Sequence, residues 1–211
     1  PGLQIEYAIK NTSNQSIQIE FNIEAVSNLM PVWLGERTGM INSKDLASFD
    51  PSNNRWMVKD SLNPWYVVHG STVKGEASKM VFSKTNKPNT AVSNTTYKIE
   101  IKPNAVYYLP FTIAGSAKSK EQAMSSYNQI KNAAASLLAI KKKRVLNLNQ
   151  YSTLTLNDNA IATSFEWLKY NSDWLTQDVE GIGKGVVAGL PDYPWWFGGD
   201  MVYTLKGLIA M

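Results

Sequence analysis

One ten-residue segment of the chain concentrates side chains that could do chemistry. Residues 191–200 read PDYPWWFGGD, so four aromatic rings and two carboxylates share a loop whose path proline and glycine constrain. Sugar rings present apolar C–H faces and a rim of hydroxyl groups, and their binding sites combine aromatic platforms with carboxylates that accept hydrogen bonds. A buried aromatic cluster that anchors a loop between helices has the same composition, so both interpretations stay open.

Asp200 ends this segment and is our first candidate for a catalytic residue. The apolar spacing of Met201, Leu205 and Leu208 predicts a helix that begins near Asp200. An aspartate at that place can cap the free backbone N–H groups of the helix, or it can direct its carboxyl group into a sugar site. The residue type alone does not separate the two roles.

A second aromatic candidate lies in the loop 30–37. Trp33 stands there close to Glu36 and Arg37, which joins an indole to an oppositely charged pair. Such a group could contact a sugar, although an ordinary ion pair beside a tryptophan is the slightly favoured explanation of the loop. Trp33 is therefore a candidate substrate-binding residue.

The composition excludes several classes of site. The 211 residues include no cysteine and one histidine, His69. Disulfides, thiolate metal sites and multi-histidine metal centres are therefore excluded, and a Ser-His-Asp triad is disfavoured. We expect neither a metal nor a cofactor, and we interpret His69 as a structural residue of a strand.

The charge and hydropathy patterns indicate neither a nucleic-acid partner nor a membrane. The net charge of +4 comes largely from the run 141–144, and four basic residues at the end of a helix are usually a solvated face. No apolar run approaches the length of a transmembrane helix, and the first residues lack the pattern of a signal peptide. The compartment stays open, with the cytoplasm favoured.

Residues 1–115 follow the two-residue period of antiparallel strands. Apolar and polar side chains alternate over 3–10 and 17–25, which gives each strand one wet face, and the polar stretch between them predicts a hairpin. Further strands are expected near 56–60, 65–70, 77–83, 96–102 and 105–114. Such strands need a second sheet to cover their apolar faces, so we predict an antiparallel β-sandwich domain over 1–115.

After residue 115 the apolar period changes to that of helices. A capping box at Ser119 and Gln122 predicts a long helix over 119–147, within a linker region at 116–155. Asp158 is the expected N-cap of a second helix, and a third helix follows the glycine-, proline- and aromatic-rich loop 181–199. The predicted class is thus α+β and multidomain.

Both ends of the sequence favour an internal piece of a longer protein. The chain starts without an initiator methionine directly in a strand, and it stops within an apolar helix that has no glycine or polar cap. We therefore expect a fragment.

The stretch 188–200, AGLPDYPWWFGGD, followed by an apolar helix, resembles the first active-site loop of bacterial and archaeal glycogen-debranching-type amylo-α-1,6-glucosidases. It is similar, more loosely, to glucoamylases and to family 63 α-glucosidases. The resemblance extends to LMPVWLGE at 29–36 and NPWYVV at 63–68. Those enzymes place a β-sandwich before a linker helix and an α/α toroid, so the resemblance implies that 156–211 are the first part of a truncated toroid.

The resemblance also implies an inverting hydrolase of α-glucosidic bonds, with an α-glucan or oligosaccharide as substrate. Asp200 would be its general acid or a ligand of sugar hydroxyls, and many relatives carry an arginine where this chain has Gly199. The substrate-binding residues implied beside Asp200 and Trp33 are Asp192, Tyr193, Trp195 and Trp196. The second catalytic carboxylate of such enzymes lies much later in the chain, so these residues alone would be inactive.

Two further expectations concern partners. Helices of an incomplete toroid leave apolar faces that call for the rest of the same polypeptide or favour self-association of the fragment. The alternative from another functional class is a non-catalytic carbohydrate-binding β-sandwich module, which needs no second carboxylate.

Overall fold

A computed structural model describes residues 1–32, 35–77 and 88–210 of the chain. It divides into two compact units, the first made of Pro1–Met30 and Ile41–Ala134, the second of Pro31–Met40 and Ala135–Met211. The boundary falls inside the long helix α1 (Lys120–Tyr151), next to Ala133, whose φ of −125° and ψ of 19° interrupt the helical backbone.

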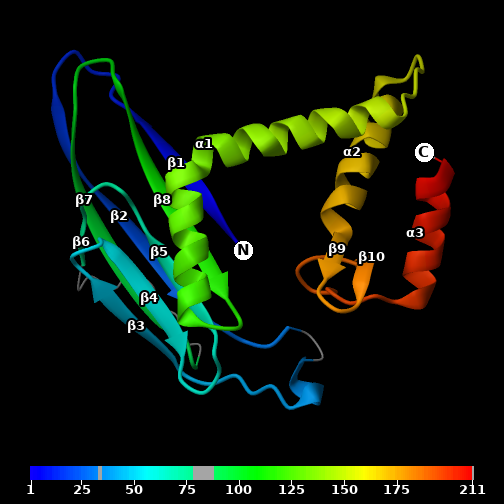
Figure 1. The fold of residues 1–211 in the computed structure, drawn as a ribbon. Coiled ribbons are helices and arrows are strands. Elements are labelled where there is room, and N and C mark those ends of the chain that lie inside the picture. The colour runs from blue at the N-terminus through cyan, green and yellow to red at the C-terminus, as the bar shows by residue number, and fades with distance from the viewer. Residues whose placement is uncertain (33–34, 78–87, 211) are drawn as a thin grey trace. The chain divides into compact units, whose positions relative to one another are not determined.

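The first unit is built on two antiparallel sheets (Figure 1). The larger sheet has the strand order β1 (Gly2–Lys10), β8 (Val106–Ser116), β5 (Tyr66–Gly70), β4 (Arg55–Asp60) and β3 (Asp45–Asp50). The smaller sheet has the order β2 (Ile17–Ser27), β7 (Ala91–Ile101) and β6 (Glu76–Ala77). The 3-10 helix η1 (Gly35–Thr38) follows β2 in the chain.

An apolar core joins the two sheets. It buries Tyr97, Ile99 and Ile101 of β7 together with Leu109 of β8, and the apolar residues of β1 and β2 pack around them. The apolar side chains of the predicted alternation in β1, β2 and β7 therefore lie in the core between the sheets. The α+β class is confirmed, and the two facing sheets fit the predicted β-sandwich.

The other face of the five-stranded sheet is covered by the first turns of α1. Ala123 and Tyr127 of the helix are buried against Val68 of β5 and Ala114 of β8. Strand β8, an inner strand of this sheet, consequently packs on both faces, with Leu109 directed to the sandwich core and Ala114 to the helix. This explains why its sequence is more apolar than a strand with one wet face requires.

The predicted hairpin of the first two strands is wrong. β1 pairs with β8 and β2 pairs with β7, so consecutive strands lie in different sheets. The connection between β7 and β8 also passes from one sheet to the other. Alternation shows which face of a strand is wet and leaves its partner undetermined, because either pairing buries the same side chains.

Asn11 links the two connections that pass between the sheets, β1 to β2 and β7 to β8. Its Nδ2 donates to the carbonyl oxygens of Gln15, Ile101 and Lys102 at 2.8, 3.0 and 3.0 Å. Its Oδ1 accepts from the backbone N–H of Ser13 at 2.9 Å. Only 1% of the Asn11 surface is exposed, so one buried amide satisfies backbone groups of both connections.

Most other predicted strands are present with shifted ends. The strands expected near 56–60, 65–70, 96–102 and 105–114 correspond to β4, β5, β7 and β8. Of the strand expected at 77–83, β6 covers only its first residue, and the rest lies outside the described residues. The strand β3 was not predicted.

The predicted helices are confirmed with small changes. The Ser119 Oγ accepts from the Gln122 N–H at 3.1 Å, which is half of the expected capping box, and the Gln122 side chain instead accepts from Ser116. Asp158 caps α2 (Asn159–Leu175) by accepting from the N–H groups of Ala160 and Ile161. The third helix, α3, spans Gly198–Ala210.

One end of the sandwich interior is polar. His69 is buried there, with its Nε2 3.0 Å from the Ser93 Oγ of the opposite sheet. Burial lowers the pKa of His69 to about 4. Asp45 of β3 and Asp60 of β4 are also buried; burial raises the pKa of Asp45, the Leu29 N–H opposes this, and Asp60 adds to it.

We expect His69 to make the first unit less stable in acid. Between pH 6.5 and 4 the unfolded chain binds a proton at His69 that the folded chain does not, so the free energy of unfolding falls as the pH falls. The slope approaches about 1.4 kcal/mol per pH unit. Urea unfolding across this range measures it, with His69→Gln as the non-titrating variant. Equal pH dependence of both proteins would contradict the prediction.

We expect Asn11→Ala to destabilise the first unit by about 2–4 kcal/mol, because it leaves buried carbonyl groups without donors. Asn14→Ala, in the exposed part of the same connection, is the matched control and should change stability by less than about 0.5 kcal/mol. Chemical denaturation of both variants tests this. A similar loss of stability in both variants would show that Asn11 has no special role.

Candidate functional site

The loop expected at 181–199 begins as a hairpin. Strands β9 (Thr176–Val179) and β10 (Gly183–Val186) pair directly after α2. Their turn closes through a hydrogen bond from the Ile182 N–H to the Val179 carbonyl at 3.0 Å, with Gly181 at a φ of +79°. Glycine suits this left-handed position. The interpretation of the whole segment as irregular is therefore wrong for its first part.

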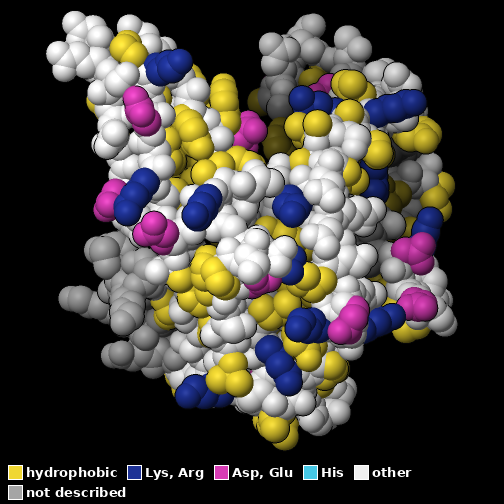
Figure 2. Space-filling model, turned by 60° about the vertical axis from the view of Figure 1, so that its left-hand side comes forward, with side chains coloured by type: hydrophobic (Ala, Val, Ile, Leu, Met, Phe, Trp, Pro, Cys, Tyr) yellow, Lys and Arg dark blue, Asp and Glu magenta, His cyan; other side chains and the backbone are white. Residues whose placement is uncertain are grey.

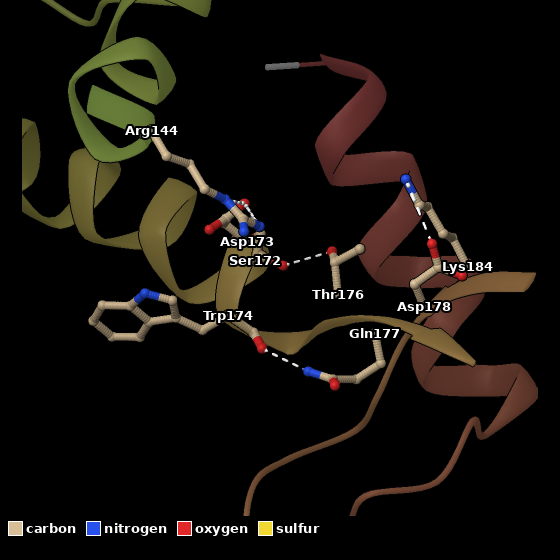
Figure 3. Close-up of polar contacts among 8 residues, drawn as sticks. All are labelled: Arg144, Ser172, Asp173, Trp174, Thr176, Gln177, Asp178 and Lys184. Carbon is tan, nitrogen blue, oxygen red and sulfur yellow. Dashed lines mark hydrogen bonds and ion pairs between the residues drawn. The ribbon is translucent and has the colours of Figure 1, made fainter. Parts of the chain in front are cut away.

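The end of α2 leads directly into this hairpin (Figure 3). The Thr176 hydroxyl donates to the Ser172 carbonyl at 2.8 Å. The Gln177 Nε2 donates to the Trp174 carbonyl at 3.1 Å. The Val187 N–H donates to the Leu175 carbonyl at 2.9 Å, so both sides of the hairpin are anchored to the last helical turn.

A second, smaller turn presents Asp192 and Tyr193. Gly189 and Tyr193 exchange backbone hydrogen bonds of 3.0 and 2.9 Å, and the Ala188 N–H donates to the Trp195 carbonyl at 3.2 Å. Leu190, Pro191 and Asp192 form the tip, and the Leu190–Pro191 peptide is cis. Asp192 is exposed, and Tyr193 keeps 52% of its surface exposed.

Asp200 lies in the first turn of α3 and is exposed. The helix begins two residues earlier than predicted, and the Met201 N–H donates to the Phe197 carbonyl at 2.9 Å. Asp200 is thus the third helical residue rather than the capping residue. A carboxylate in the first turn still interacts favourably with the helix dipole.

The aromatic candidates differ in their surroundings. Trp195 is 37% exposed. Trp196 packs on β10, where a Cβ added at Gly185 would meet its Cε2 at 2.6 Å. One face of this indole is therefore occupied by the hairpin. Trp33 lies outside the described residues.

The structure thus brings Asp192, Tyr193 and Trp195 together on one short turn, and Asp200 follows at the start of the next helix. The exposed carboxylates and rings could accept hydroxyl hydrogen bonds and stack on a sugar. Trp196 lies on the same segment and packs on Gly185 of the hairpin.

Sequence reasoning missed a hollow elsewhere in the second unit, whose lining is mostly apolar with a few polar and charged groups. Its volume is about 270 Å³, and its lining comprises Leu148, Tyr151, Ser152, Lys169, Ser172, Asp173, Thr176 and Leu208. None of the six predicted site residues is among these lining residues. Its charged groups come from α2.

The two charged side chains of the hollow are both engaged. Lys169 is 8% exposed, and its Nζ donates to the Ser152 carbonyl at 2.7 Å and lies 5.3 Å from the Phe165 ring centre. Asp173 accepts from Nε and Nη2 of Arg144 at 3.1 and 2.6 Å (Figure 3). A lysine four residues after Phe165, on the same helical face, was the signal available in the sequence.

Aromatic side chains also line an exposed face of α2. Trp167 packs edge-on against Tyr170 and Trp174, with ring centres 6.0 and 6.1 Å apart. About half of each indole is exposed, 52% for Trp167 and 47% for Trp174. Edge-on rings do not share one plane, so they form a poorer platform for a flat sugar face than parallel rings would.

Charges are mixed over the molecular face shown in Figure 2, where lysine and arginine side chains alternate with aspartate and glutamate. The basic run Lys141 to Arg144 is exposed, and Arg144 pairs with Asp173. Among the described residues, no helix is long and apolar enough to span a bilayer. The same residues contain no cluster of three or more histidine or acidic side chains that could hold a metal ion.

No protein-family model matches the chain, and no curated protein matches it significantly.

We expect Gly185→Ala to displace Trp196 and to cost about 1–3 kcal/mol, because the new methyl group would overlap the indole. Gly189→Ala is the matched control, since its Cβ would lie 3.9 Å from the nearest side-chain atom. Indole N–H chemical shifts report the displacement, and thermal unfolding reports the cost. An unmoved Trp196 resonance in Gly185→Ala would contradict the packing described.

Proposed function

We propose that this chain is part of an inverting glycoside hydrolase that acts on α-glucosidic bonds, of the glycogen-debranching or a related α-glucosidase type. The observation that carries the proposal is the exposed set of Asp192, Tyr193 and Trp195 on one hydrogen-bonded turn, with exposed Asp200 at the start of the following helix. Carboxylates beside accessible rings are the groups that a saccharide site needs.

Each residue has a proposed role. Asp200 protonates the leaving oxygen or binds a sugar hydroxyl, and Asp192 accepts a hydroxyl hydrogen bond. Tyr193 and Trp195 stack on sugar rings. Trp196 packs on Gly185 of the hairpin and remains a proposed sugar contact. Trp33 remains a proposed substrate contact.

An inverting reaction needs a second carboxylate that activates water on the opposite face of the sugar. The two groups must lie roughly 6.5–9.5 Å apart so that the water fits between them. We propose that this partner comes from a later part of the same polypeptide, on an α/α toroid of which α2 and α3 are the first helices. The 211 residues would then bind without turnover.

Apolar exposure on these helices supports the need for further partners. The exposed apolar side chains of the helices in the second unit include Trp167, Leu168, Trp174, Val202, Tyr203 and Ile209. Patches of this kind usually contact other protein. We propose that the rest of the polypeptide covers them, and that the chain by itself self-associates.

The alternative function is a non-catalytic carbohydrate-binding module. The exposure of Tyr193 and Trp195 favours it equally, because stacking alone suffices for a binder. The two proposals differ in what they require of Asp200.

The test replaces Asp200 by asparagine in the longer polypeptide that the proposal requires. We expect the rate on maltooligosaccharides or branched glucan to fall by about 10²–10⁴-fold, since general acid catalysis is worth that much. Asp178→Asn, an exposed carboxylate on the neighbouring hairpin, should leave the rate unchanged. The 211-residue chain alone should show no turnover.

The opposite results are as informative. Robust hydrolysis by the 211-residue chain would refute the need for a second, later carboxylate. Calorimetric binding of α-glucan oligosaccharides that survives Asp200→Asn and is lost in Trp195→Ala, with no hydrolysis by the longer polypeptide, would establish the binding module instead.

A further inference from the structure

A buried lysine lines the hollow of the second unit. Lys169 of α2 belongs to its lining, and 8% of the residue is exposed. Lysine is almost never buried to this degree unless it is paired. A buried ammonium group is unfavourable unless a negative group or several acceptors compensate its charge. The partners of Lys169 therefore show whether the chain's own groups complete the hollow.

The contacts of Lys169 leave its charge without a negative partner. Its Nζ donates to the Ser152 carbonyl at 2.7 Å and lies 5.3 Å from the centre of the Phe165 ring. An ammonium group has three N–H donors, so this hydrogen bond uses one of them. Over the described ranges 1–32, 35–77 and 88–210, Lys169 has no ion pair with a carboxylate.

The carboxylate of the hollow is occupied by another cation. Asp173, one helical turn after Lys169, accepts from Nε and Nη2 of Arg144 at 3.1 and 2.6 Å (Figure 3). The charges of Asp173 and Arg144 cancel. Among the described residues that line the hollow, Lys169 thus contributes one positive charge that nothing neutralises.

A hydroxyl group beside Lys169 also lacks a partner. The Ser152 Oγ is buried, and it has no hydrogen-bond partner in the part of the chain that the structure describes. The other two hydroxyls of the lining are engaged: Ser172 donates to the Leu168 carbonyl and Thr176 to the Ser172 carbonyl, both at 2.8 Å. Because the Ser152 carbonyl accepts from Lys169, the unpartnered hydroxyl and the ammonium group lie on the same part of the wall.

We propose that the hollow binds a small organic monocarboxylate through Lys169 and Ser152. One carboxylate oxygen accepts from the Lys169 Nζ and the other from the Ser152 hydroxyl, so the ligand supplies the missing charge and the missing hydrogen bond. The apolar body of the ligand contacts Leu148, Tyr151 and Leu208. A dianion such as phosphate fits less well, because Asp173 already neutralises Arg144.

The size of the hollow restricts the ligand to a small molecule. Its volume of about 270 Å³ lies just below the range of sites for drug-sized ligands, so an acid with one ring or a short chain is suitable. The lining comes from α1, α2 and α3, and a bound ligand would therefore stabilise the packing of these helices. The inference is independent of the proposed glycosidase function, because no candidate sugar-binding residue lines the hollow.

Calorimetric titration of the 211-residue chain with phenylacetate tests the proposal. We expect a dissociation constant of about 0.1–1 mM, which the small size of this probe allows. Phenylacetamide has the same shape without the charge and should bind about tenfold more weakly. Chemical-shift changes at the methyl groups of Leu148 and Leu208 should locate phenylacetate in the hollow.

Lys169→Met removes the charge and keeps an apolar side chain of similar length. We expect it to weaken phenylacetate binding by about tenfold or more and to abolish the preference over phenylacetamide. Lys184→Met is the matched control, because Lys184 is an exposed lysine on β10 that pairs with Asp178. It should leave the affinity unchanged.

Ser152→Ala separates binding from folding. The Ser152 hydroxyl is buried without a partner, so its removal should leave the Tm unchanged or raise it. The same change should weaken phenylacetate binding by about fivefold, because the ligand loses one donor. This variant and the comparison with phenylacetamide decide the question if Lys169→Met does not fold.

Four results would each overturn the proposal. The first is the absence of phenylacetate binding, and the second is equal affinity for phenylacetamide, which would make the hollow a purely apolar site. The third is unchanged affinity in Lys169→Met or Ser152→Ala. The fourth is a set of chemical-shift changes confined to residues outside the hollow.

Discussion

The five-stranded sheet has to be covered on both faces, and the architecture of the first unit follows from this. The smaller sheet covers one face with Tyr97, Ile99 and Ile101, and α1 covers the other with Ala123 and Tyr127. Apolar burial on this scale is the main favourable term in folding. Removing either cover would expose the buried side chains of β8, an inner strand of this sheet that packs on both faces.

The sequence predicts well those features that depend on a local pattern. The alternation of apolar residues located β1 and β2, and Asp158 located the start of α2, because a capping residue acts within one turn. Strand β3 escaped detection because Asp45 points inward and Leu46 outward, which inverts the expected alternation. Its burial comes from tertiary contacts that no local pattern contains.

The same local patterns do not predict which strands pair with each other. The first two strands resemble a hairpin in sequence, yet they lie in different sheets, and the buried amide of Asn11 between them bonds to carbonyls some 90 residues away in the chain. The candidate site was also predictable only in part. The exposure of Asp192 and Asp200 follows from a polar loop at the start of a helix. The packing of Trp196 on Gly185 does not, because it depends on a hairpin whose strands show no apolar alternation.

Apolar and polar groups in the interior of the sandwich contribute to the fold in different ways. Its apolar part supplies free energy but tolerates alternative pairings, since many side chains of similar size could fill it. Its polar groups, the Asn11 amide at the two connections and the pair of His69 and Ser93 between the sheets, each require particular partners at particular distances. A misregistered sheet would leave them buried and unsatisfied, which is costly. Stability therefore comes mainly from the apolar contacts, while the choice of one strand pairing over another comes from a few buried polar atoms.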